Sequence, residues 1–144
     1  MSEPTVYAED VNYWQTSQSS ADTWIDKAKK EITGIGGNIM TESFADQQGR
    51  SAFLLEFRLG SDVFKVVWPI LPSYSGKDRA AKVQAATMLY HDVKAKVVSA
   101  KVLGIRTAFF TYLVLPDGRT AAQASGSEIA RYVPNILALP SKTE

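Results

Sequence analysis

The segment from Ser51 to Leu71 reads SAFLLEFRLGSDVFKVVWPIL and consists of two apolar stretches separated by a short turn. Within each stretch the large apolar side chains recur at every second residue, which is the period of a strand with one buried face. These side chains are Phe53, Leu55, Phe57 and Leu59 in the first stretch and Phe64, Val66, Trp68 and Ile70 in the second. The short glycine-containing turn predicts an antiparallel hairpin. Pro69 places the end of the second strand there or puts that strand at a sheet edge.

A further strand and two helices flank this hairpin. Residues 38–46 (NIMTESFAD) precede it and predict a strand that is joined to the hairpin by the turn QQGR. Before that strand, residues 19–33 predict a helix that Ser19 or Ser20 caps. After the hairpin, residues 77–103 predict the longest helix of the chain. Its core face is defined by apolar residues at helical spacing, namely Val83, Ala86, Leu89, Tyr90, Val93, Val97 and Ala100.

Towards the C-terminus the apolar stretch TAFFTYLVL (107–115) predicts another strand, and the turn PDGR follows it and suggests a second hairpin. Residues 125–140 predict a last helix, which Pro134 interrupts. The expected order is α-β-β-β-α-β-(β)-α. This order predicts an α+β fold in which the long helix packs across an antiparallel sheet of three to five strands. We expect a single domain over residues 17–140, an aromatic N-terminal arm over 1–16 and a short tail over 141–144.

The charge of the chain is unevenly distributed. Residues 76–106 contain seven of the sixteen basic residues and only two of the fifteen acids, which gives this segment a formal charge of +5. The remainder carries nine bases and thirteen acids, a charge of −4, so the net charge of +1 conceals a strongly basic helix. Such a concentration of charge attracts polyanions even when the net charge is small.

Several functional classes find no support in the sequence. The chain has no cysteine and a single histidine, His91, so we expect neither a thiolate metal site nor a catalytic triad. There is no Walker A motif, and the GIGG stretch at 34–37 lacks the context of a dinucleotide-binding loop. No bound cofactor is expected. The one metal site left open is a carboxylate cluster assembled by folding, for which the candidates are Glu42, Asp46, Glu56 and Asp62.

The acidic N-terminus lacks the pattern of a secretory signal, and no apolar run reaches the length of a membrane span. We therefore expect a cytoplasmic protein with no membrane partner.

The basic helix is the strongest functional feature, and its alternative explanation is a lysine-rich face that keeps the helix hydrated. Basic residues in the first turns of a helix lie beside free backbone amides, which favour phosphate groups. Gly76 leaves room there for a phosphate, and an exposed aromatic residue before the helix could stack on a base. The predicted nucleic-acid-binding residues are Lys77, Arg79, Lys82, Lys94 and Lys101 on the helix, Arg58 and Lys65 on the hairpin, and Tyr74 in the loop.

The segment DRAAKVQAA (78–86) resembles the second helix of double-stranded-RNA-binding domains, which begins with a basic cluster followed by a Lys-x-x-Ala-Ala pattern. The order helix, three strands, helix from residue 19 to about residue 92 is similar to that family as well. The resemblance implies that Lys77, Arg79 and Lys82 contact phosphates across a groove. Asp78 stands where the family has a lysine, and the Gly-Pro-x-His loop signature is absent. The β-β-β-α order is also similar to the core of single-strand annealing proteins of recombination.

Together these features predict a non-catalytic, weakly sequence-specific nucleic-acid-binding protein, such as a recombination or repair accessory. The sequence leaves open whether the ligand is DNA or RNA and whether it is single- or double-stranded. We also expect a homo-oligomer. The alternative is a structural or assembly protein, cellular or viral, that acts by self-association. In that case its surfaces would be the aromatic arm, the AFFTYLVL stretch and the late YVPNILALP segment. An enzyme is the third option and would need divalent ions.

Overall fold

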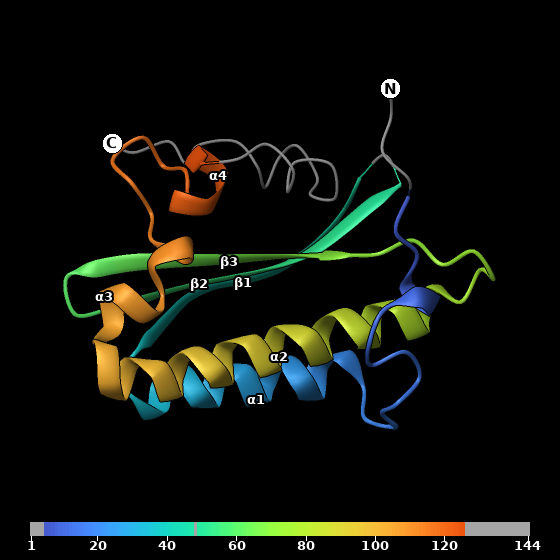
Figure 1. Cartoon of the computed structure of the whole chain (residues 1–144), viewed down its shortest axis with the longest axis horizontal. Helices are drawn as coiled ribbons and strands as arrows, with labels where there is room; N and C mark the ends of the chain where they lie inside the picture. The colour runs from blue at the N-terminus through green and yellow to red at the C-terminus, as the bar shows by residue number, and fades with distance from the viewer. Residues whose placement is uncertain (1–4, 48, 126–144) are drawn as a thin grey trace.

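The computed structural model describes residues 5–47 and 49–125, which form an α+β fold of two layers (Figure 1). One layer is an antiparallel sheet with the strand order β1-β2-β3. Its strands are β1 (Asn38–Gln47), β2 (Arg50–Leu59) and β3 (Asp62–Ile70). The other layer consists of α1 (Ala21–Gly34) and α2 (Asp78–Leu103), which lie side by side and run in the same direction across one face of the sheet. The predicted α+β fold, with the long helix across an antiparallel sheet, is confirmed.

The period-two pattern of the hairpin places its apolar residues against the helices, as predicted. Phe57 of β2 and Phe64 of β3 are direct partners in the ladder, and their rings stack with centroids 5.7 Å apart. Both side chains are fully buried in the core that the sheet shares with α1 and α2. Burial of several such aromatic rings is the main source of stability for a domain of this size.

Helix α1 begins and ends where its sequence predicts. The Ser20 hydroxyl accepts a hydrogen bond from the Thr23 amide at 3.2 Å, so Ser20 is the capping residue. Ile25, Ala28 and Ile32 form the buried stripe. After the helix the chain turns back so closely that a β-carbon on Gly37 would lie 2.4 Å from the Ile32 side chain and 2.8 Å from its carbonyl oxygen. Only glycine fits this passage into β1.

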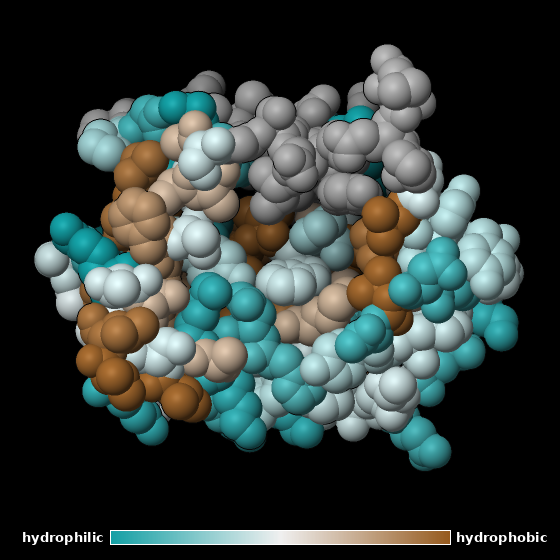
Figure 2. Space-filling model, in the orientation of Figure 1, coloured by the Kyte–Doolittle hydropathy of each residue, from teal (hydrophilic) through white to brown (hydrophobic). Residues whose placement is uncertain are grey.

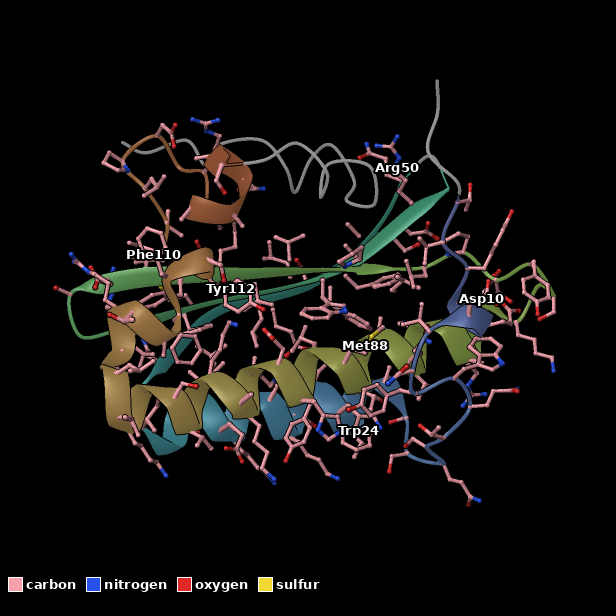
Figure 3. All side chains as sticks on the ribbon, in the orientation of Figure 1. Asp10, Trp24, Arg50, Met88, Phe110 and Tyr112 are labelled. Atoms are coloured by element: carbon pink, nitrogen blue, oxygen red, sulfur yellow. The ribbon has the colours of Figure 1, made fainter. Side chains whose placement is uncertain are left out.

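The N-terminal arm packs on the body of the same chain. Its short 3-10 helix η1 (Ala8–Asp10) lies against the first half of α2, near the labelled Asp10 in Figure 3. The buried amide nitrogen of Gln84 on α2 lies within 3.0 Å of the backbone carbonyl oxygens of Ala8, Val11 and Asn12. A polar side chain in the first half of the long helix therefore fixes the path of the arm.

The strand predicted over 107–115 is not formed, and this prediction is wrong. Gly104, with φ of 91°, ends α2, and the chain continues as α3 (Ile105–Ala108) and η2 (Phe110–Tyr112). Phe109, between these turns, is fully buried against Phe57 and Phe64. The apolar residues that suggested a strand instead include Phe109, which fills the open end of the core.

Only isolated bridges remain of the predicted second hairpin. Leu113 bridges Phe64 at the outer edge of β3, and Val114 bridges Thr120 across the PDGR turn. The last described element is α4 (Ala121–Ser125). The remainder of the helix predicted over 125–140, the YVPNILALP segment and the tail at 141–144 lie outside the described residues.

Candidate functional site

A concave region lined by polar residues lies where α1 and α2 both begin, at the end of the helical layer beside the arm (Figure 1). A cleft of about 660 Å³ opens there between the first turn of α2 and the chain that leads into α1. Its lining residues are Gln15, Ser17, Gln18, Ser19 and Ser20 from the arm side and Gly76, Lys77, Asp78, Arg79, Ala80 and Val83 from the α2 side. Apart from Ala80 and Val83, the lining consists of polar residues and glycine.

The N-terminus of α2 presents free donors to this cleft. Its N-cap residue, Lys77, makes no capping hydrogen bond through its side chain, and no other side chain within residues 5–47 and 49–125 accepts a hydrogen bond from the amides of the first turn. The Lys77 amide itself donates to the Ser73 hydroxyl at 3.0 Å. Because α1 begins at the same cleft, the positive ends of two helix dipoles point into one hollow. Backbone amides and parallel dipoles of this kind favour an anionic group such as phosphate.

Basic side chains surround the cleft. Lys77 and Arg79 are exposed and line it. Arg79 also lines two smaller hollows of about 350 and 330 Å³, which Lys82 shares. Lys82 is held more firmly than its neighbours, because its ammonium group lies 4.1 Å from the centre of the Phe44 ring on β1. Such a cation–π contact contributes about 0.5–1 kcal/mol at a surface.

Acids also line these hollows. Asp78 lies in the main cleft beside Lys77 and Arg79, Asp22 lines one smaller hollow, and Asp46 lines the other. Asp22 and Asp78 are each in the first turn of a helix, where a carboxylate stabilises the helix. The negative charges of Asp22 and Asp78 also repel an incoming anion from the positive ends of the two helix dipoles. The main cleft keeps an excess of one positive charge, from two cations and one carboxylate.

The loop before α2 is fixed by the arm. The Glu9 carboxylate accepts hydrogen bonds from the hydroxyls of Ser73 and Ser75 and from the amides of Tyr74 and Ser75. Partial burial acts to raise the pKa of Glu9, but the serine hydroxyls and backbone amides together lower it to about 2. Glu9 is therefore ionised at neutral pH.

Tyr74 lies in this fixed loop, two residues before Gly76. Its side chain is 65% exposed, and its ring makes an edge contact with Tyr7 at a centroid distance of 5.6 Å. The loop therefore presents an exposed aromatic ring next to the cleft.

The fold brings some predicted residues together and separates others. Lys77, Arg79, Lys82 and Tyr74 cluster at the start of α2. Lys94 and Lys101 are exposed on α2 but lie 15 and 22 residues beyond Arg79, or about 22 and 33 Å along the helix. Among the described residues, none of the five cations predicted to bind nucleic acid from this helix (Lys77, Arg79, Lys82, Lys94 and Lys101) forms an ion pair with Asp or Glu, whereas Lys96 pairs with Asp92.

Arg58 and Lys65 do not extend the basic surface of the helix as predicted. Both alternate with core residues, so they lie on the face of the sheet that is turned away from α1 and α2. Arg58 is exposed there, whereas Lys65 is only 5% exposed and lies opposite Glu56 in the ladder. Burial lowers the pKa of Lys65, and the charge of Glu56 opposes this effect.

The candidate carboxylate cluster is not assembled. Glu42 pairs with Lys29 at 2.5 Å, Asp62 pairs with Arg106, and Asp46 accepts a hydrogen bond from Ser51. Within the described ranges, no three His, Cys, Asp or Glu residues converge as metal ligands. His91 lies among aromatic rings, stacked on Tyr13 at 5.0 Å and close to Trp24.

The polar stretch QTSQSS at 15–20 was not identified as part of a site from the sequence. Ser19 and Ser20 were predicted only as candidate caps of the first helix, and the other side of the cleft lies about sixty positions later in the chain. The one available signal was that this run contains only hydroxyl and amide side chains between an aromatic arm and an amphipathic helix.

Comparisons of the chain with protein-family models, with curated proteins and with solved structures find no match. None of the described helices is both long enough and apolar enough to cross a membrane.

Proposed function

We propose that this protein binds single-stranded nucleic acid without catalysis and holds a backbone phosphate in the cleft at the start of α2. The observation that carries the proposal is the convergence of an uncapped helix N-terminus with Lys77 and Arg79, neither of which forms an ion pair with an Asp or Glu of the described residues. Phosphate is the oxyanion that such an arrangement of amides and cations suits best.

Tyr74 favours an unpaired strand. An exposed tyrosine beside a phosphate site can stack on a base only when that base is not already stacked within a duplex. The loop that carries Tyr74 is fixed by Glu9, so little conformational entropy is lost when a base stacks there. Contacts to the phosphate backbone carry no sequence information, which favours weak sequence specificity.

Lys94 and Lys101 extend the surface. They lie on the exposed side of the same helix, so a strand that leaves the cleft along α2 would meet them in turn. At about 22 and 33 Å from Arg79, Lys94 and Lys101 both lie beyond the screening distance of about 8–10 Å at physiological salt. We therefore expect them to add affinity independently of the cleft.

Fluorescence anisotropy with labelled single-stranded and duplex oligonucleotides tests the proposal. The double variant Lys77→Ala/Arg79→Ala should weaken single-strand binding and reduce the salt dependence by about 0.7 log units per lost phosphate contact. The matched variant Lys94→Ala/Lys101→Ala removes the same charge from the same helix and should weaken binding less. Asp78→Asn removes the competing carboxylate and should tighten binding. Equal losses from the two double variants would mean that general charge, and not the cleft, attracts the strand.

A further inference from the structure

Strand β1 is an open edge of the sheet. The described residues pair it only with β2, whereas the other edge strand, β3, receives Leu113 and a hydrogen bond from the Val114 amide. Eight of the ten residues of β1 are exposed, including Phe44 at 43%. A strand of this length offers a row of free backbone groups about 34 Å long.

Few of the usual devices protect this edge. Proteins block open edges with proline, lysine, short strands or bulges. Strand β1 contains neither proline nor lysine, and its single irregularity is the bulge between Ile39 and Thr41. From residue 41 to residue 47 the ladder is regular, so this part of the edge can accept another strand.

From this edge we infer that two copies of the chain pair through β1 in an antiparallel arrangement and form one continuous six-stranded sheet. Directly opposite residues in such a pair share a face, so a symmetric dimer places one residue of β1 opposite its own copy. If the two-fold axis passes at Glu42, the Glu42 side chains of the two copies lie directly opposite each other. If it passes at Phe44, Glu42 of one copy lies opposite Asp46 of the other. Both arrangements place like charges directly opposite each other, which is destabilising.

Ser43 at the centre avoids both conflicts. Glu42 then lies opposite Phe44, and Thr41 lies opposite Ala45 of the second copy. The two Glu42 side chains become diagonal neighbours, about 7–8 Å apart. Each is already neutralised by Lys29, whose ammonium group lies 2.5 Å from it.

The charges on α1 also suit a second copy of the chain. The Lys29 ammonium group contacts Asp26 on the same helix and Glu42 on β1. Lys29 and Asp26 therefore lie on the side of α1 that is nearest to the open edge. A two-fold axis perpendicular to the sheet keeps both helical layers on one face and makes the two α1 helices antiparallel. Asp26 of each copy is then directed towards Lys29 of the other copy, so the two-fold symmetry places opposite charges next to each other.

The absence of cysteine allows a direct test of the register. Under mild oxidation, Ser43→Cys should form a disulfide-linked dimer, because residue 43 faces its own copy across the axis. Thr41→Cys lies on the same face of the same strand and is the matched control. Its own copy would be four residues away, about 14 Å, so it should not cross-link.

Light scattering without nucleic acid supplies the second measurement. The wild-type chain should have twice the monomer mass of 15.8 kDa. Ser43→Lys, which places two like charges opposite each other, should halve that mass while leaving the circular dichroism spectrum unchanged. The inference is overturned if the wild type is a monomer throughout a dilution series. It is also overturned if Thr41→Cys cross-links as readily as Ser43→Cys, or if Ser43→Lys stays dimeric.

Neither measurement depends on nucleic-acid binding, so the dimer and the proposed function can fail separately.

Discussion

At the scale of single residues, two polar side chains determine the shape of the cleft region. Gln84 attaches the N-terminal arm to α2, and Glu9 attaches the same arm to the loop that carries Tyr74. Both contacts join residues more than sixty positions apart in the chain. Neither contact can be predicted from the sequence, because a glutamine within a helix and a glutamate in an acidic arm are both common. Only folding brings their partners to them.

Replacing Gln84 with methionine keeps the volume of the side chain and removes its amide. The carbonyls of Ala8, Val11 and Asn12 then lose their donor in a part-buried position. We expect the free energy of unfolding to fall by about 1–3 kcal/mol, as measured by urea denaturation. An unchanged stability would mean that the arm does not depend on this contact.

Glu9 predicts a specific acid sensitivity. Its pKa in the folded protein is about 2, below the ordinary value of 4.5, so its hydrogen bonds stabilise the fold fully above pH 4.5. That stabilisation is lost as the pH falls through about 2. The stability difference between the wild type and Glu9→Gln, followed by tryptophan fluorescence in urea, should therefore be constant near neutrality and shrink in acid. A difference that stays the same down to pH 2 would contradict this assignment.

At the scale of elements, local sequence patterns predicted most of the fold. The alternating hairpin, the serine cap of α1 and the apolar face of α2 each specify an element within its own residues. Residues 107–115 are the exception, because the strand predicted there is not formed. Their composition is typical of a strand, but the open end of the core between β2, β3 and α2 requires a buried aromatic residue, and Phe109 fills it. A tertiary requirement overrode the local preference.

Adjacent phenylalanines allow this correction to be tested. Phe109 is fully buried, whereas Phe110, the first residue of η2, is 53% exposed. Phe109→Ala should lower the free energy of unfolding by about 3–5 kcal/mol. Phe110→Ala, the matched control, should change it by no more than about 0.5 kcal/mol. Thermal and urea denaturation of the two variants measure these changes. Similar losses of unfolding free energy in both variants would contradict the described packing.

At the scale of the whole molecule, the two ends of the helical layer differ in character. The end where α2 stops carries exposed Val98, Val102 and Leu103, and Figure 2 shows apolar surface gathered there. The opposite end holds the cleft, the N-terminal amides of α2 and the exposed cations Lys77 and Arg79. Charge counting along the sequence located the basic helix, but it could not show that only its first turns meet a second helix terminus.

The positions of Arg58 and Lys65 on the hairpin were also predicted only in part. Alternation along a strand predicted that Arg58 and Lys65 lie opposite the core face, and they do. Deciding whether that face adjoins the basic helix requires knowing which side of the sheet α2 covers. The sequence alone does not supply that information.

The most direct test of the proposed site is a nuclear magnetic resonance titration of the isotope-labelled protein with a short single-stranded oligonucleotide. Phosphate binding in the cleft predicts the largest saturable shifts at the backbone amides of Asp78, Arg79 and Ala80, together with those of Ser19 and Ser20 across the cleft. Shifts concentrated around Lys94 and Lys101, or on the sheet face that carries Arg58, would contradict the account. So would the absence of any saturable shift at low salt.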